Sequence, residues 1–385
     1  MQTAVFETKK AVASPVRDRV KKRIRAQAER LGPGGKLPKV VELCECLDVA
    51  GATVNVALEE LEVEGVIRRR RGSGIYVAPH VGRKTVGLMI PVRDMNPSCF
   101  SGILVDACRR RADRQSERFL TYIQHLHGAA ADDPDGHWAL LEDVRRGRLN
   151  GLLAVGLLTG DELESLRVND VQTVMMADES VEGVCGTVSI DVGAMVHMGV
   201  EALAARGRRR IALITPHGFR RSPHHPWVKA RGQWQEDLDA WQVAMGKQGL
   251  EPRPEWTWEY VPTPDDLSGR VSFFTNEAQG HRAFKALWEQ TERPDGLVIL
   301  DDMMTRGALA AARQAGVEVG RDVAIATHAN CGSPALLGEE TRLMRMEVDA
   351  GEIVDAMFGM LEAAWAGKAR RAHHRAVPRL CVEDK

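Results

Sequence analysis

Four consecutive arginines, Arg68 to Arg71, stand directly before a Gly-Ser-Gly turn in the segment EGVIRRRRGSGIYV. Two β-prone halves flank this glycine-containing connection, and the pattern predicts a β-hairpin with a cationic tip. Adjacent like charges repel one another unless an anion is bound between them. The glycines would let the backbone approach such an anion closely. The chemistry predicted here is therefore the binding of a polyanion.

The distribution of charge along the chain supports the same interpretation. Residues 1–84 carry 17 Lys and Arg against 10 Asp and Glu, a net charge of +7, whereas the remainder carries 35 against 43, a net of −8. Opposite signs in the two parts indicate a basic module that meets a polyanion, joined to a module that does not.

The elements around the arginines define the type of basic module. Apolar spacing predicts helices over residues 14–31, 36–49 and 53–66, with a break of three residues before the last of them. Two short helices joined by about three residues form a helix-turn-helix, whose second helix is available to enter a major groove. With the hairpin over 66–77, the order predicts a winged helix-turn-helix that binds double-stranded DNA.

Several residues in this order resemble the GntR-type winged helix over roughly residues 14–78. The family's Leu-Pro opening, the Thr-Val start of its recognition helix and its Gly-x-Gly wing tip have matches at Leu37-Pro38, Thr53-Val54 and Gly72-Ser73-Gly74. Three positions depart from it, because Val41, Ala50-Gly51 and Asn55 replace residues that usually include arginine. An asparagine can still read adenine through two hydrogen bonds. The predicted DNA-binding residues are Lys39, Thr53, Asn55, Arg69, Arg70, Arg71, Gly72, Ser73 and Gly74.

The rest of the chain alternates apolar β-type runs with amphipathic helical segments. Repeated βα units predict doubly wound parallel sheets, and about 300 residues predict two such lobes. The expected fold class is α/β: a winged helix-turn-helix over residues 1–78, a linker over 79–85, and a two-lobed domain with parallel sheets over 86–385.

In parallel sheets, ligands bind beyond the carboxyl ends of the strands. Polar residues that follow predicted strands are therefore candidates for ligand binding. These are Asp94, Asp178, Asp191, Asp302, His328 and Asn330. An Asp after a strand also caps helices, which is an equally good explanation of Asp302.

The second part of the chain, over about residues 85–384, is similar to the effector domain of LacI/GalR regulators. The resemblance is carried by the runs around Gly207-Arg208-Arg209-Arg210-Ile211 and RPDGLVILDD. It implies a periplasmic-binding-protein fold, a homodimer, and a sugar-binding aspartate at Asp302. The family's sugar-binding arginine corresponds to Asp237, and its Gly-Phe-Asp-Asp to residues 327–330. A carboxylate in place of an arginine inverts the charge that the site prefers in its ligand. The sequence is therefore also compatible with a polyol or a cationic ligand.

Trp241 is a further ligand candidate, because aromatic rings stack on sugar faces. Its spacing of seven from Trp234 and Trp227 also predicts one face of a helix packed in a core or interface. Both interpretations remain open at this stage.

Several classes of function find no motif in the sequence. Gly-x-Ser-x-Gly, HExxH, the kinase motifs and a strand-linked GxGxxG are absent, so no enzyme activity, catalytic residue or cofactor is predicted. The adjacent His224 and His225 lack zinc spacing, and no metal is expected. Seven scattered cysteines, no apolar run of membrane length and no signal peptide pattern indicate a cytoplasmic protein without a membrane partner.

The sequence therefore predicts a dimeric one-component repressor whose affinity for its operator is modulated by a small ligand, such as a sugar or polyol. The alternative is a DNA-binding scaffold whose effector pocket has degenerated and binds nothing.

Overall fold

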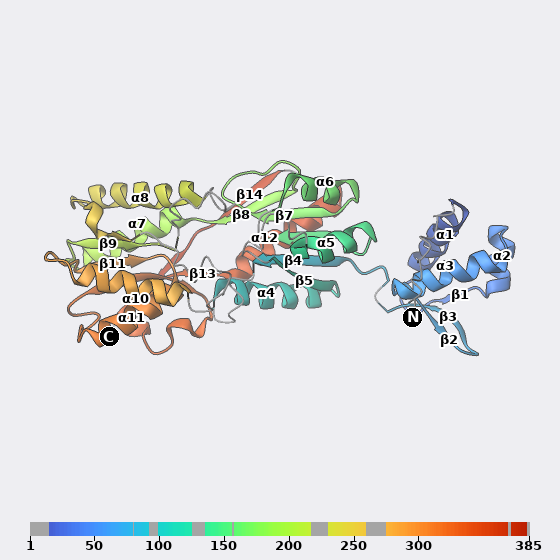
Figure 1. Cartoon of the computed structure of the whole chain (residues 1–385), viewed down its shortest axis with the longest axis horizontal. Helices are drawn as coiled ribbons and strands as arrows, with labels where there is room; N and C mark the ends of the chain where they lie inside the picture. The colour runs from blue at the N-terminus through green and yellow to red at the C-terminus, as the bar shows by residue number, and fades with distance from the viewer. Residues whose placement is uncertain are drawn as a thin grey trace, which may run out of the picture. The chain divides into compact units, whose positions relative to one another are not determined.

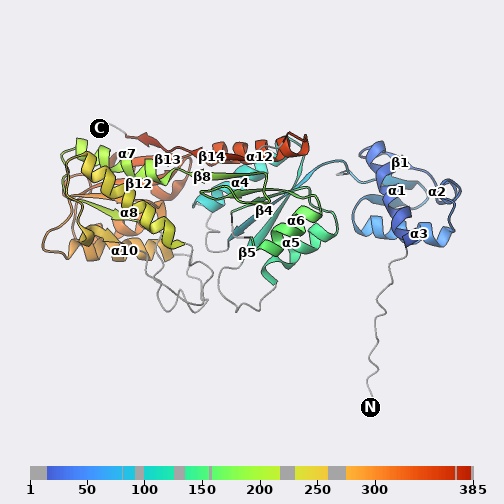
Figure 2. The ribbon, with the colours of Figure 1, turned by 90° about the horizontal axis from the view of Figure 1, so that it is seen from above.

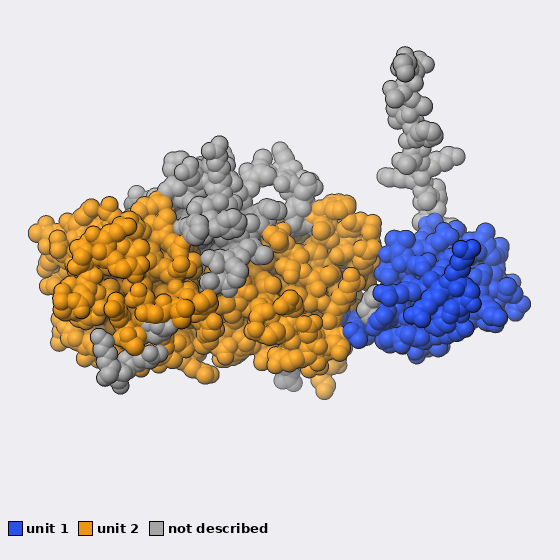
Figure 3. Space-filling view, turned by 90° about the horizontal axis from the view of Figure 1, so that it is seen from below, with its two compact units in different colours: residues 1–84 blue, residues 85–385 orange. Residues whose placement is uncertain are grey.

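The computed structural model describes residues 15–79, 81–91, 99–124, 135–155, 158–216, 230–258, 275–368 and 371–382. Contacts within the chain divide it into two compact units, residues 1–84 and residues 85–385 (Figure 3).

The first unit is a winged helix-turn-helix built on one small apolar core (Figure 1). Val20 and Ile24 of the first helix, Leu58 and Leu61 of the third, and Ile67 of the hairpin are almost completely buried in it. Its elements are α1 (Pro15–Leu31), β1 (Lys36–Leu37), α2 (Val40–Leu47), α3 (Gly51–Val63), β2 (Ile67–Arg70) and β3 (Gly74–Val77).

The turn between α2 and α3 differs in detail from the sequence prediction. α3 begins at Gly51, two residues earlier than expected, with Ala50 as its N-cap. The chain turns at Asp48, which adopts the left-handed conformation with φ of 50°. Asp tolerates this region better than most residues, so the turn does not need a glycine at this position. Gly51 and Ala52, which were predicted to lie in the turn, are then part of α3.

The predicted hairpin is part of a three-stranded antiparallel sheet in the order β1-β3-β2. β1 was not predicted, because two residues are too short to show an alternating pattern. It pairs Lys36 with Tyr76 and Leu37 with Ile75. The sheet therefore holds the hairpin against the segment that precedes α2.

The second unit contains two six-stranded sheets, each in its own lobe (Figure 2). In lobe 1 the strand order is β14-β8-β7-β6-β4-β5, with every neighbouring pair parallel. Its strands are β4 (Thr85–Pro91), β5 (Arg118–Gln124), β6 (Gly151–Ala154), β7 (Gln172–Met176), β8 (Gly186–Ile190) and β14 (Ala372–Ala376). Its helices are α4 (Phe100–Arg114), α5 (Asp135–Arg145), α6 (Gly160–Val168) and α12 (Ala350–Trp365).

Lobe 2 has the strand order β10-β9-β11-β12-β13-β15, parallel except for the last pair. Its strands are β9 (Ile211–Ile214), β10 (Thr257–Trp258), β11 (Gly296–Ile299), β12 (Ala324–Asn330), β13 (Leu343–Val348) and β15 (Arg379–Cys381). Its helices are α7 (Val192–Ala205), α8 (Ala230–Lys247), α10 (Thr275–Trp288) and α11 (Asp302–Gln314), with short 3₁₀ turns at Pro254–Trp256, Pro334–Leu336 and Glu340–Arg342. The prediction of two lobes with parallel sheets is confirmed.

The chain passes between the lobes three times: from β8 to α7, from β13 to α12, and from β14 to β15. Each lobe therefore contains segments from distant parts of the sequence. In each sheet the strand order reverses at the first strand, β4 in lobe 1 and β9 in lobe 2. Such switch points create a crevice at the carboxyl ends of the strands, where parallel sheets bind ligands.

Helices α10 and α11 of lobe 2 cross in very close contact at two glycines. A Cβ atom on Gly280 would lie 1.9 Å from the carbonyl oxygen of Met304, and one on Gly307 would lie 1.8 Å from that of Glu277. Backbone atoms cannot move aside as a flexible side chain can. The two glycines therefore fix the distance between the helices.

We expect Gly307→Ala to destabilise the second unit by about 1–3 kcal/mol, because the added methyl overpacks against backbone. Gly359→Ala is the matched control, since this glycine of α12 has open space around it. It should stabilise the unit by about 0.5–1 kcal/mol through helix propensity. Thermal unfolding of the two variants measures both effects, and equal melting temperatures would contradict the prediction.

Candidate functional site

The recognition helix α3 carries no Lys or Arg, and its charged residues are Glu59, Glu60 and Glu62. Glu60 lies within ion-pair distance of Arg17 at 3.4 Å and of Lys21 at 3.2 Å. Several of the cations of α1 are thus engaged inside the unit. The positive charge available to DNA must come from elsewhere.

Three predicted DNA-binding residues on or beside the helices are accessible. Asn55 is exposed on the first half of α3, and Thr53 is partly exposed beside it. Lys39 is exposed at the N-cap of α2. This arrangement leaves the Asn55 amide free to meet a base edge, the kind of contact by which asparagine reads adenine.

Arg69, which was predicted to contact DNA, makes its contacts within the first unit. Its guanidinium donates to the carbonyl oxygen of Asn55 at 3.0 Å and lies 3.7 Å from the Glu62 carboxylate, while its backbone N–H donates to Glu62 at 2.9 Å. Arg69 thus joins the wing to α3. Its neighbours Arg68 and Arg70 are exposed on the opposite face of the strand, because side chains alternate along β2.

The wing tip, Arg71 to Ser73, has the backbone geometry that its glycines permit. Gly72 has φ of 73° and Gly74 has φ of 126°, both in the range that side chains disfavour. The N–H of Ser73 donates to the carbonyl oxygen of Arg70 at 2.9 Å and closes the turn. Arg71, Gly72 and Ser73 are all exposed.

A second cluster of polar residues lies at the carboxyl ends of β11 and β12 in lobe 2. Asp301, not Asp302, caps α11, since its carboxylate accepts from the N–H of Met304 at 2.7 Å. The side chain of Asp302 is therefore not used for capping. It accepts a hydrogen bond of 2.8 Å from the amide of Asn330, and both side chains are buried.

Burial shifts the pKa values of Asp302 and His328 in this cluster. Desolvation raises the pKa of Asp302 to about 6, although the hydrogen bond from Asn330 and nearby backbone N–H groups oppose the shift. Burial lowers the pKa of His328, which is therefore neutral at pH 7. Within the described residues, neither ring nitrogen of His328 has a hydrogen-bond partner, and nor does the Asn330 carbonyl oxygen. Buried polar atoms are normally hydrogen-bonded, so a bound ligand or ordered water would account for these three atoms.

The remaining predicted ligand residues lie where the chain passes between the lobes. Asp191 caps α7, accepting from the N–H of Ala194 at 2.8 Å, and lies 3.9 Å from Arg375 of β14. Asp178, Asp191 and Arg375 line a cavity of about 160 Å³ with Asp237. Asp237 is buried and accepts a hydrogen bond of 2.6 Å from the hydroxyl of Thr215. The sequence predicted no role for Thr215 or Arg375; Thr215 follows β9, so the strand-end criterion could have found it.

Trp241 does not have the exposure that ligand stacking requires. Its ring is completely buried in the core between the sheet of lobe 2 and the α7–α8 face. The spacing of seven thus reflects packing, and the ligand interpretation of Trp241 is corrected. Asp94 lies outside the described residues.

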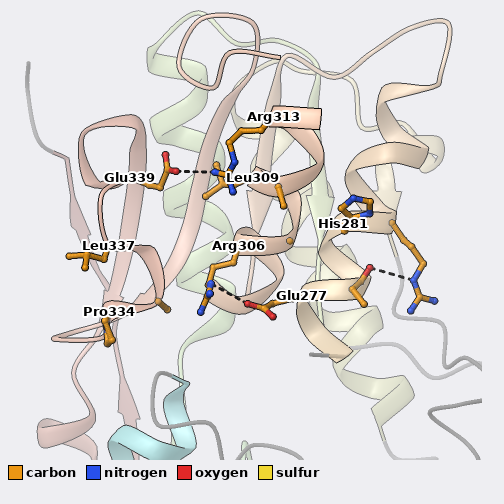
Figure 4. Close-up of a pocket in the computed structure, with 13 residues that line it drawn as sticks. Glu277, His281, Arg306, Leu309, Arg313, Pro334, Leu337 and Glu339 are labelled. Carbon is orange, nitrogen blue, oxygen red and sulfur yellow. Dashed lines mark hydrogen bonds and ion pairs between the residues drawn. The ribbon is translucent and has the colours of Figure 1, made fainter. Parts of the chain in front are cut away.

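A larger pocket, of about 710 Å³, lies on the outer helical face of lobe 2 (Figure 4). Its floor consists of small residues of α10 and α11, and Leu337 beside it is 78% exposed. Ion pairs of 3.1 Å join Arg306 to Glu277 and Arg313 to Glu339. This pocket is lined by α10, α11 and the segment 334–339 that follows β12, and it shares no lining residue with the Asp302 cluster.

Comparisons with known proteins agree with both halves of this geometry. Residues 13–77 match the model of bacterial regulatory proteins of the gntR family, and residues 200–383 match a periplasmic binding protein-like domain. The Uxu operon transcriptional regulator of Escherichia coli strain K12 is 46% identical over 50 residues, 13% of this chain and 20% of that regulator. The HTH-type transcriptional repressor MelR of Bacillus subtilis strain 168 is 23% identical over 290 residues, 73% of each chain.

Solved structures show the same fold for the second unit. A LacI transcriptional regulator from a Rhodococcus species aligns with a TM-score of 0.57 and 18% identity, covering 78% of this chain and 97% of that one. The regulator CcpA of Lactococcus lactis aligns with a TM-score of 0.57, 16% identity and coverage of 78% and 97%. At this level of identity the likeness shows the fold.

The chain therefore combines a gntR-family winged helix-turn-helix with a periplasmic binding protein-like domain, whose fold is also that of solved LacI-type regulators. It is a transcriptional regulator with a DNA-binding domain and an effector domain, and the two curated relatives named above are transcriptional regulators. Among the described residues, no helix is both long and apolar enough to cross a membrane.

We expect Asp302→Asn to stabilise the protein at neutral pH. The substitution should also remove the contribution of this carboxyl to the pH dependence of the free energy of unfolding. A carboxyl whose pKa is raised on folding contributes stability that is fully present below its unfolded value of 3.8 and is lost as the pH rises through about 6. At pH 7.5 the variant should gain up to about 3 kcal/mol, since one pKa unit corresponds to about 1.4 kcal/mol. At pH 4 the gain should be small.

Melting temperatures of both proteins between pH 4 and 7.5 test this. Asp322→Asn is a control, because the Asp322 carboxylate is exposed and paired with Arg321. A difference between the Asp302 variant and wild type that does not change with pH would contradict the buried carboxyl as its cause.

Proposed function

We propose that the protein is a dimeric one-component repressor whose affinity for operator DNA changes when a small hydroxylated ligand binds between strand ends of the second unit. The observation that carries the proposal is the set of buried polar atoms of His328 and Asn330 beside Asp302 that have no hydrogen-bond partner in the part of the chain that the structure describes. A repressor function is supported by the likeness to MelR, which is itself called a repressor. A cytoplasmic location is part of the proposal.

The chemistry of the cluster favours a neutral ligand with hydroxyl groups, such as a sugar or polyol. A neutral His328 offers one donor and one acceptor, and the Asn330 carbonyl oxygen is an acceptor. A hydroxyl group can both donate and accept, so neighbouring hydroxyls can satisfy all three atoms together with the Asp302 carboxylate. A LacI family regulator from Enterococcus faecium, 16% identical, has a structure with bound ribose.

The outer helical face of lobe 2 is the surface that we propose for dimerisation. Its arginines and glutamates are already paired within the chain, Arg306 with Glu277 and Arg313 with Glu339, so this face carries little net charge to repel a second copy. A two-fold interface places the same surface of both copies in contact. Leu337 supplies an exposed apolar side chain next to the pocket that a second copy would bury.

The alternative is a DNA-binding scaffold that needs no ligand. One observation favours it: Asp237, which corresponds to the arginine that binds sugars in LacI/GalR regulators, is buried and hydrogen-bonded to Thr215. The protein's own side chains thus occupy part of the region between the lobes. A measurement of ligand binding distinguishes the ligand-responsive repressor from the scaffold.

DNA binding is tested by titrating a fluorescent duplex from the region upstream of the protein's own gene, at 50 and 200 mM salt. We expect tight binding that resists a random-sequence competitor, since specific sites bind about 10³–10⁷ times more tightly than non-specific DNA. Binding that random DNA displaces at equal concentration would exclude a specific operator in that region.

Ligand binding is tested by melting the wild type with a panel of sugars and polyols. A ligand at 100 times its Kd should stabilise the protein by about 2.7 kcal/mol. Asn330→Ala should lose this response, while Asn169→Ala, a change at the exposed end of α6, should keep it. A panel without any effect on melting or DNA affinity would favour the scaffold.

Dimerisation is tested by Leu337→Glu, which places a charge at the proposed interface. We expect a shift from dimer to monomer in light scattering at micromolar concentration, because a buried unpaired charge is costly. Val168→Glu is the control, since Val168 is 67% exposed on lobe 1. A variant at Leu337 that remains dimeric would exclude this face.

A further inference from the structure

The wing sheet has an outer face on which Arg70, a predicted DNA-binding residue, lies near Lys36 and Tyr76, to which the sequence assigned no role. In the register of the sheet, Lys36 of β1 and Arg68 of β2 both lie opposite Tyr76 of β3. Burial alternates along β2 and β3, so Arg68, Arg70 and Tyr76 lie on the face away from the core. Three strands therefore bring three cations around one aromatic ring.

The ring of Tyr76 holds two of these cations directly. The Lys36 ammonium nitrogen lies 5.6 Å from the ring centroid, and the central carbon of the Arg70 guanidinium lies 5.1 Å from it. Both distances are within the range of cation–π attraction. The ring thus offsets part of the repulsion between two like charges that lie on one small surface.

Gly74 makes room for this arrangement. A Cβ atom at this position would lie 2.9 Å from Cε of Lys36 and 3.9 Å from the Tyr76 ring. The glycine thus lets the Lys36 side chain pass over β3 to reach the ring. A side chain at this position would displace the Lys36 side chain from the ring, in addition to straining the backbone at φ of 126°.

The Tyr76 hydroxyl connects the outer face to the wing tip. It lies 2.8 Å from the hydroxyl of Ser73 and 3.3 Å from the Ser73 carbonyl oxygen. The cations on the face and the turn that ends the hairpin are therefore held as one rigid surface.

No carboxylate in the described part of the chain forms an ion pair with Lys36, Arg68 or Arg70, as the salt bridges of the unit involve other cations. Arg69, one residue away, is paired with Glu62 on the inner face. A group of cations held in place without a counter-charge is the arrangement that binds an external anion. On a DNA-binding module this anion is a backbone phosphate.

We propose that Lys36 and Arg70 bind a phosphate of the DNA backbone and that Tyr76 is the positioning residue that holds them for it. This inference rests on the proposed function, since it requires that the unit binds DNA. It also explains how the unit binds DNA with a recognition helix that has no cation, because the outer face of the wing supplies the missing phosphate contacts.

The test uses the full chain with two fluorescent duplexes, one from the region upstream of its own gene and one of random sequence. Each phosphate contact contributes a slope of about 0.9 to the dependence of log K on log salt. Lys36→Met should therefore weaken binding to both duplexes and reduce the ratio of the Kd values at 200 and 50 mM salt by up to about three-fold, the effect of losing one whole phosphate contact. Lys22→Met is the matched control, as Lys22 is exposed on α1.

Tyr76 is tested by two variants that leave the charge unchanged. Tyr76→Leu removes the ring and should lower the salt dependence like Lys36→Met, while Tyr76→Phe keeps the ring and should retain most of the wild-type salt dependence. A purely structural role of Tyr76 would lower affinity without changing the salt dependence. Circular dichroism melts identify any variant that is unfolded, and Lys36→Met tests the site without altering the core.

Wild-type salt dependence in Lys36→Met would overturn the inference, as would an equal decrease in Lys22→Met, which would indicate net charge alone. In either case the wild type still binds DNA and the proposed function stands. A wild type that binds neither duplex would overturn both.

Discussion

The parallel pairing of strands is the constraint on which the second unit depends. Parallel strands end at the same edge of a sheet, so residues distant in the sequence meet there without any further device. Asp302 follows β11 and Asn330 ends β12, and the register of these two strands brings their side chains within a hydrogen bond. The close crossing at Gly280 and Gly307 then fixes the distance between α10 and α11, the helix that begins with Asp302.

Patterns that repeat along the sequence were predicted well, because they reflect burial over many residues. Hydrophobic period identified the three helices of the first unit and most strands and helices of the second. The strand-end criterion selected Asp302, His328 and Asn330, of which Asp302 and Asn330 are hydrogen-bonded to each other. Periodicity could not locate β1, which has two residues, or separate Asp301 from Asp302 as the helix cap.

Which face a side chain occupies could not be predicted where the local sequence is uniform. The run Arg68 to Arg71 contains no apolar residue that would show which side chains face the core. A shift of the strand register by one residue would exchange the arginines that face solvent with those that face inward. The structure turns Arg69 inward to Asn55 and Glu62 and leaves Arg68 and Arg70 outside. Trp241 shows the same limit on a helix, since spacing alone does not distinguish a buried ring from one that faces a ligand.

The segregation of charge constrains how a ligand could act on DNA binding. The second unit has a net charge near −8 from its composition, so its general interaction with DNA is repulsive and attraction is left to the first unit. In the dimeric repressor that we propose, a ligand within the second unit acts on DNA through the placement of the two first units relative to each other. Operator half-sites lie at fixed helical spacing, and a small change in that placement is enough to prevent both modules from binding at once. A basic module on a neutral or cationic effector domain would lack this dependence, because general attraction would hold the protein on DNA in either state.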